Sequence, residues 1–190
     1  MTLLFEPLTD ETKVFLAVQF LNLKQKGDDK KLLTEESLDI EVSDSHPVYA
    51  LEITDIAEGK GLDKAKLIGS RCFIEMKSEV SAAEIGQESN LASINEGPFT
   101  FEFIRAIEFV SRSDRVARED YQVRFLLVPA LYTAALWLHS AINSKHDLLI
   151  TLPLSDEREK IVITADSFYE KLKSNAKQTL KAQQELDFDD

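Results

Sequence analysis

The strongest periodic pattern in the chain lies after Pro98, where apolar residues recur three and four positions apart. This spacing places them on one face of an α-helix. A proline suits the first turn of a helix, because the N–H that it lacks would have no partner there. The apolar positions of this predicted helix are Phe99, Phe103, Ala106, Ile107 and Val110.

Two more segments have helical spacing. The first covers residues 10–27, with Thr9 as a plausible N-cap and Gly27 as its end. The second begins near the C-terminus, where Thr164 or Asp166 can cap it. Its apolar residues form one thin stripe, so we expect this helix to dock shallowly on the rest of the protein.

Alternating apolar and polar residues, or short apolar runs, predict strands in four places. These are residues 38–42, 48–53, 66–76 and 121–128. Gly69 marks a possible bulge in the third of them. Residues 78–93 are polar and small and show no clear period, so we expect a loop there with at most one helical turn.

The segment after Pro129 fits two structures. Residues 130–139 can form a short helix with Pro129 in its first turn. They can equally form a strand that pairs with residues 121–128 and continues through a turn to residues 148–152. The hairpin is the favoured interpretation, and it brings the ends of these strands close together.

These elements predict one α+β domain over residues 1–184, with a mostly antiparallel sheet, two packed helices and a peripheral C-terminal helix. No internal repeat and no linker rich in serine, glycine and proline divides the chain. Residues 185–190 form an acidic tip that we expect to be mobile.

Composition narrows the classes of function. The chain has 34 acidic and 22 basic residues, a formal charge of −12, so nucleic-acid binding is not expected. The longest apolar run, residues 125–138, is too short to span a membrane. Cys72 is the only cysteine and cannot form an intramolecular disulfide. We therefore expect a soluble, cytoplasmic protein, and we expect Cys72 to be a small buried residue and not a catalytic thiol.

Acidic residues are concentrated in residues 32–59, which contain eight of them and no lysine or arginine. On the exposed side of a sheet these carboxylates can attract a basic protein partner. A solvated surface without a partner is the simpler explanation of this stretch. The main functional hypothesis from the sequence is nevertheless a protein-interaction module that binds through an acidic surface.

Strong catalytic and cofactor signatures are absent from the sequence. If the hairpin forms, His139, His146 and Asp147 come near one another, and two imidazoles with one carboxylate suffice to bind zinc or iron. Their alternative role is simply to flank an exposed turn. The arginines between Arg105 and Arg124 are matched by a similar number of acids, so ion pairing on a wet surface is expected for them.

The turn Asn95–Glu96–Gly97 precedes the helix that begins at Pro98, and the N-terminus of a helix can bind an anionic ligand. Glu96 can fill that position with its own charge. The alternative functional hypothesis is thus a small enzyme or a ligand- or metal-binding domain, with a pocket near Asn95–Phe99 and His139–Asp147. The sequence names no cofactor and leaves catalysis open.

Self-association is a further possibility. The region from Leu126 to Leu138 has more apolar residues than one sheet face of this size needs. A homodimer would cover the excess.

Overall fold

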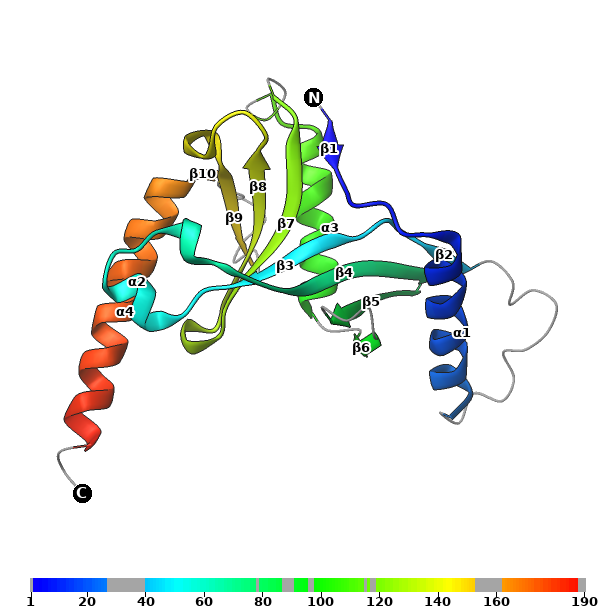
Figure 1. The fold of residues 1–190 in the computed structure, drawn as a ribbon, viewed down its shortest axis with the longest axis horizontal. Helices are drawn as coiled ribbons and strands as arrows, with labels where there is room; N and C mark the ends of the chain where they lie inside the picture. The colour runs from blue at the N-terminus through cyan, green and yellow to red at the C-terminus, as the bar shows by residue number, and fades with distance from the viewer. Residues whose placement is uncertain are drawn as a thin grey trace.

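The computed structural model describes residues 2–26, 40–77, 79–86, 91–95, 98–114, 116, 119–152 and 162–187. These residues form one sheet of ten strands with four α-helices, which confirms the predicted α+β class (Figure 1). The strands are β1 (Leu3–Leu4), β2 (Ile40–Val42), β3 (His46–Ala50), β4 (Lys66–Met76), β5 (Glu79–Gly86), β6 (Leu91–Asn95), β7 (Tyr121–Val128), β8 (Thr133–Ser140), β9 (Leu148–Leu152) and β10 (Ile163–Thr164). The helices are α1 (Asp10–Lys26), α2 (Ile53–Ala57), α3 (Pro98–Ser111) and α4 (Ala165–Asp187).

The sheet has the strand order β10-β9-β8-β7-β3-β4-β5-β6, with β1 beside β7 and β2 beside β4. Among the strands described, only the pairs β1–β7 and β3–β7 are parallel. The sheet is therefore mostly antiparallel, as predicted. The strand β7 lies at its centre and joins the hairpin β8–β9 to the half that contains β3, β4 and β5.

Helices cover both faces of the sheet. On one face, α3 packs through Phe103 and Val110 against a core that includes Phe125 and Leu136. On the opposite face, α1 packs through Leu16 and Phe20 at one end of the sheet. At the other end of that face lie α2 and α4, so that α1 and α4 mark the two ends of the molecule in Figure 1.

The predicted helices after Thr9, Pro98 and Thr164 are confirmed. The Thr9 hydroxyl accepts a hydrogen bond from the Thr12 N–H at 3.2 Å, as an N-cap does. The Thr164 hydroxyl does the same for Ser167 N–H at 3.4 Å. The predicted end at Gly27 lies outside the described residues, and α4 extends to Asp187, into the acidic tip.

The hairpin interpretation of residues 130–152 is confirmed. The strand β8 pairs antiparallel with β7 and with β9 along its length. Pro129 begins a short 3-10 helix, η3 (Pro129–Leu131), that makes the turn. The predicted bulge in β4 lies beside Gly69, because Val48 pairs with Gly69 but Tyr49 pairs with Leu67, leaving Ile68 as the extra residue.

The prediction of a loop over residues 78–93 is wrong, because β5 and β6 lie there. Ser81, Ala82 and Ala83 are fully buried in β5, which pairs with β4 on one side and β6 on the other. A strand that is covered on both faces does not alternate between polar and apolar residues. The predicted strand 48–53 also differs, since β3 begins at His46 and ends at Ala50, and Ile53 starts α2.

The apolar region from Leu126 to Leu138 is covered within one chain. Leu136 and Leu138 face α3, while Leu126 and Trp137 face α2 and α4. The observation that suggested a homodimer is thus accounted for without a second copy, and self-association stays a prediction. In the ranges that the structure describes, no helix combines the length and the apolar composition that a membrane crossing requires.

Candidate functional site

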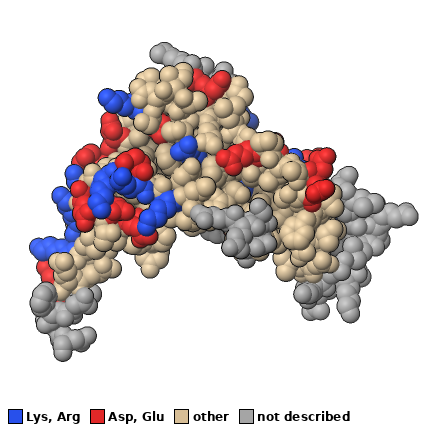
Figure 2. Space-filling model, viewed as in Figure 1, with Lys and Arg blue, Asp and Glu red and all other residues tan. Residues whose placement is uncertain are grey.

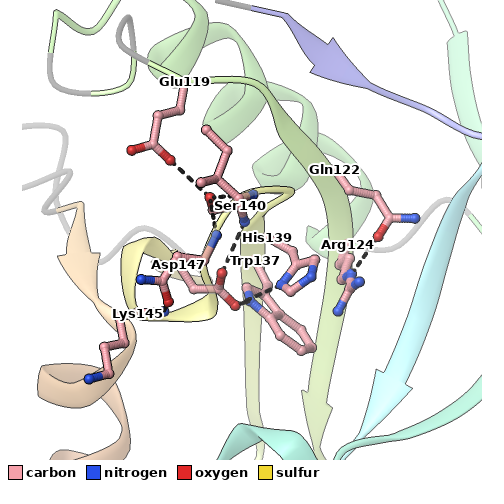
Figure 3. Close-up of polar contacts among 10 residues, drawn as sticks. Glu119, Gln122, Arg124, Trp137, His139, Ser140, Lys145 and Asp147 are labelled. Carbon is pink, nitrogen blue, oxygen red and sulfur yellow. Dashed lines mark hydrogen bonds and ion pairs between the residues drawn. The ribbon is translucent and has the colours of Figure 1, made fainter.

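The carboxylate of Asp147 organises a polar cluster at the end of the β8–β9 hairpin. Its Oδ2 atom accepts a hydrogen bond from Trp137 Nε1 at 2.7 Å and lies 2.9 Å from His139 Nδ1. Its Oδ1 atom accepts one from the Ser140 backbone N–H at 2.9 Å. Asp147 is only 2% exposed, so these contacts replace the water that a buried carboxylate loses. Figure 3 shows the carboxylate between the Trp137 and His139 side chains and the start of the next turn.

Strand pairing places the other polar residues of the site. Trp137 and His139 are two positions apart in β8 and so lie on one face of the sheet. In the neighbouring β7, Arg124 pairs with Trp137 and Gln122 pairs with His139. These four side chains therefore form two adjacent rows on the face that α2 and α4 partly cover.

Arg124 has a specific setting in this cluster. Its guanidinium carbon lies 4.7 Å from the centre of the Trp137 ring and 4.9 Å from that of Tyr49, distances at which aromatic faces attract a cation. Arg124 Nε donates to Gln122 Oε1 at 2.8 Å, and Gln122 Nε2 donates to Glu6 Oε1 at 3.1 Å. Partial burial lowers the pKa of Arg124.

A cavity of about 400 Å³ opens above this face. The sheet provides Tyr49, Arg124, Trp137 and His139, while the first residues of α4 and two 3-10 helices, η2 (Leu62–Lys64) and η4 (Ser144–His146), complete the walls. Arg124 and His139 also line a second hollow of about 340 Å³ near Phe5 and Gln122. The first cavity lies in the size range of sites for small organic molecules.

A second polar network lies beside the first. Glu119 accepts a hydrogen bond from the Ser140 hydroxyl at 2.8 Å, and its other oxygen lies 2.7 Å from His146 Nδ1. The Ser140 oxygen accepts the backbone N–H groups of Ile142 and Asn143, both at 3.2 Å. This network holds the β8–β9 turn, and Ser140 connects it to Asp147.

The structure brings together two of the three predicted metal ligands. His139 lies next to Asp147, whereas His146 pairs with Glu119. Among the residues that the structure describes, no group of three or more histidine, cysteine or acidic side chains is arranged to hold a metal ion. The pair formed by His139 and Asp147 has another chemical use. A carboxylate that holds Nδ1 orients the ring and leaves Nε2 to accept or release a proton.

The Asn95–Glu96–Gly97 turn lies elsewhere. Asn95 ends β6, an edge strand five positions from β8 in the sheet, or about 24 Å at the usual strand spacing. Phe99 packs on the α3 side, opposite the face that carries His139. Asn95 Nδ2 donates to Ser93 Oγ at 3.4 Å, while Glu96 and Gly97 lie outside the described residues. Anion binding at this turn stays a prediction, separate from the His139 cavity.

Lysines accompany most of the described acids in the acidic span. Four ion pairs join these acids to lysines: Asp44 with Lys13 at 2.8 Å, Asp55 with Lys60 at 2.8 Å, Glu58 with Lys60 at 2.7 Å and Glu52 with Lys66 at 3.7 Å. Figure 2 shows basic and acidic side chains intermixed around α2 and α4. The span therefore forms a mixed surface where it is described, and binding of a basic partner stays a prediction.

Cys72 lies in β4, against α1. It is fully buried, and desolvation raises the pKa of its thiol to about 12. Such a thiol stays protonated and is a poor nucleophile.

Comparison of the chain with protein-family models, with curated proteins and with solved structures finds no match. Sequence reasoning identified His139 and Asp147 but missed Arg124, Trp137 and Tyr49 as parts of the site. Arg124 was expected to form a surface ion pair, yet in the described part of the chain it has aromatic neighbours and no ion-pair partner. One signal was available, since an arginine inside an otherwise apolar strand needs a special environment.

Proposed function

We propose that this protein binds a small organic molecule in the cavity above Trp137 and His139. The observation that carries this proposal is the buried Asp147, which fixes the side chains of both residues at the cavity wall. A binding site works best when its polar groups are held in place before the ligand arrives, because less entropy is lost on binding.

The lining of the cavity supports the same proposal. Aromatic rings of Tyr49, Trp137 and Tyr169 supply apolar contact area, and a few polar groups converge among them. This combination of apolar walls with a small number of oriented polar groups is typical of ligand sites. Trp137 is the only tryptophan of the chain, so its fluorescence reports on this cavity alone.

The test is a pair of alanine substitutions on α4. Ala165 lines the cavity, and Ala165→Phe should fill part of it. Ala182 lies further along the same helix and is exposed, so Ala182→Phe is the matched control. Native mass spectrometry of gently purified protein, and Trp137 fluorescence with a metabolite library, should detect a ligand in the wild type and in Ala182→Phe. Both signals should be lost in Ala165→Phe.

Two results would contradict the proposal. One is a wild-type protein that carries no small molecule and whose Trp137 emission responds to no library compound. The other is a ligand that Ala165→Phe binds as tightly as the wild type does.

The pair formed by His139 and Asp147 favours a second candidate, an enzyme in which His139 transfers a proton to or from the bound molecule. The supporting observation is the 2.9 Å contact between His139 Nδ1 and the buried carboxylate. His139→Gln keeps a polar side chain but cannot shuttle a proton in this way. If the protein is an enzyme, this variant should bind the ligand but no longer convert it, as product analysis by mass spectrometry would show. A variant that converts the ligand at the wild-type rate would exclude His139 as the catalytic residue.

A further inference from the structure

Arg124 offers hydrogen-bond donors that the described residues of the protein do not use. One nitrogen of its guanidinium, Nε, donates to Gln122. Within the described residues, the two terminal nitrogens have no acceptor and the guanidinium forms no ion pair. Guanidinium groups carry donors in a fixed planar fork that matches a carboxylate or a phosphate. The part of the fork that remains available is therefore suited to an anionic group.

The neighbouring carboxylates are engaged elsewhere. Asp147 accepts bonds from Trp137 and from Ser140, and it contacts His139. Glu6 accepts a bond from Gln122, the residue that also holds Arg124 Nε. The nearest acids thus attract Arg124 from a distance without neutralising it by contact.

Two other carboxylates line the cavity, but they come from different elements. Asp63 belongs to η2 and lies 3.5 Å from Lys64, and Asp166 is exposed in the first turn of α4. Neither belongs to β7, the strand that carries Arg124. Among the described lining residues two are cations, Lys145 in η4 and Arg124 on the sheet, where Tyr49 and Trp137 hold the guanidinium in place.

We infer that the ligand of this cavity is an organic anion, whose carboxylate or phosphate group pairs with Arg124 while its body lies against the aromatic rings. The inference rests on the proposed binding function and adds the chemical class of the ligand. A half-buried cation without a contacting anion is costly, and a ligand anion removes that cost. Arg124 also borders the second hollow, but the Glu6 carboxylate lines that hollow, so the anionic group is expected on the side of the first cavity. Figure 3 shows Arg124 and His139 side by side on the sheet.

The test uses three ring compounds of similar size. Benzoate and phenyl phosphate carry the anion, and benzamide is a neutral analogue of benzoate. Each is titrated into the wild type while Trp137 emission is followed, and the affinity is confirmed by calorimetry. Binding of both anions should reach saturation. The affinity for benzamide should be at least 10-fold lower, because benzamide cannot make the charge-assisted hydrogen bonds that an anion makes with Arg124.

Variants identify the residue responsible. Arg124→Gln should weaken benzoate binding at least 10-fold, and Arg124→Lys should bind with intermediate affinity because it keeps the charge and loses the fork. Arg105→Gln removes an arginine from α3, on the opposite face of the sheet, and should bind as the wild type does. Circular dichroism confirms that each variant is folded.

The outcomes separate the two proposals. Equal binding of benzoate and benzamide, or wild-type affinity in both Arg124 variants, would overturn the anion inference and leave the binding function standing. Failure of all three probes to saturate the wild type would count against the cavity as a binding site and against the anion together.

Discussion

His46 is the first residue of β3, and its side chain lies between the sheet and α3, where aromatic rings surround the imidazole. The side chain is fully buried, and its ring stacks on Phe103 with the centroids 4.5 Å apart. Phe5 and Phe73 contact it from other sides. Within the described part of the chain neither ring nitrogen has a hydrogen-bond partner. Burial, with a smaller contribution from the Arg71 cation, lowers the pKa of His46 from 6.5 to about 3.

This shift makes the stability of the fold depend on pH. Well above pH 6.5, His46 is neutral in both the folded and the unfolded state, so its lowered pKa does not change the free energy of unfolding. As the pH falls below 6.5, the unfolded chain takes up a proton that the folded protein does not bind. Each further pH unit lowers the free energy of unfolding by about 1.4 kcal/mol. Between pH 6.5 and pH 4.5 the loss is about 2 kcal/mol, and any folded pKa below about 4 gives nearly this value.

The variant His46→Leu should lose this dependence. Urea unfolding, followed by Trp137 fluorescence at half-unit steps from pH 7.5 to pH 4.5, measures the free energy for the wild type and for the variant. At pH 7.5 the two should be similar, because the variant loses the ring stacking on Phe103 but no longer buries two unpartnered nitrogens. From pH 7.5 to pH 4.5, the stability of the variant relative to the wild type should rise by nearly 3 kcal/mol, roughly the full loss that the wild type suffers over this range.

A core variant that keeps His46 provides the control. Val110→Ala shortens a fully buried side chain of the same core and should lower stability by about 2 kcal/mol at every pH. Its pH profile should run parallel to that of the wild type. Parallel profiles for the wild type and His46→Leu would refute the argument, since they would mean that His46 binds its proton equally well in both states.

Three further predictions concern single sites. Gly69→Ala should lower the free energy of unfolding by about 2 kcal/mol, because its Cβ would clash with the Ile85 carbonyl oxygen; an unchanged urea midpoint would contradict this. Cys72 should react with a thiol reagent only when urea unfolds the protein, because its pKa is raised to about 12, and rapid labelling of the folded protein would be inconsistent with that. Tyr132 is 94% exposed and has a φ of 49°, so Tyr132→Gly should raise stability by about 0.5 kcal/mol, and a lower thermal midpoint would argue against strain at this position.

Elements with one buried face could be predicted from the sequence, because their patterns follow the geometry of that face. The helix α3 belongs to this group, and so does the first part of β7, where Tyr121, Val123 and Phe125 alternate with less buried residues. At the far end of β7, Leu126 and Val128 are buried on the opposite face as well. The strand β5 could not be predicted, since its middle consists of Ser81, Ala82 and Ala83, small residues that fit between layers on both sides. The helix α2 was missed for another reason. It has five residues and is held by packing of Leu51 and Ile56 against α4, a contact between segments more than 100 positions apart.

The residues of the candidate site also fall into a group that the sequence could predict and a group that it could not. His139 and Asp147 were found because the hairpin that joins them is local, and its two strands could be predicted from alternation. Arg124 and Tyr49 come from β7 and β3, and only the parallel pairing of these strands places them together. That pairing involves a long connection, which no local pattern specifies. A local sequence pattern therefore predicts the residues that the hairpin contributes to the cavity. It does not predict the contribution of Arg124 and Tyr49, because their positions depend on the topology of the whole sheet.

Asp147 joins the folding of this region to its proposed function. Its Oδ1 atom holds the Ser140 backbone at the end of β8, which fixes the turn, and its Oδ2 atom holds Trp137 and His139, which face the cavity. If only the hairpin had to be stable, the Ser140 backbone N–H could donate to a backbone carbonyl or to water. The Trp137 N–H could then lie at the surface. Here one buried carboxylate performs both tasks, and burying a charge for that purpose is costly unless several donors share it. The arrangement is better explained by a need to hold Trp137 and His139 in one orientation than by the stability of the turn, which the Glu119 network already supports.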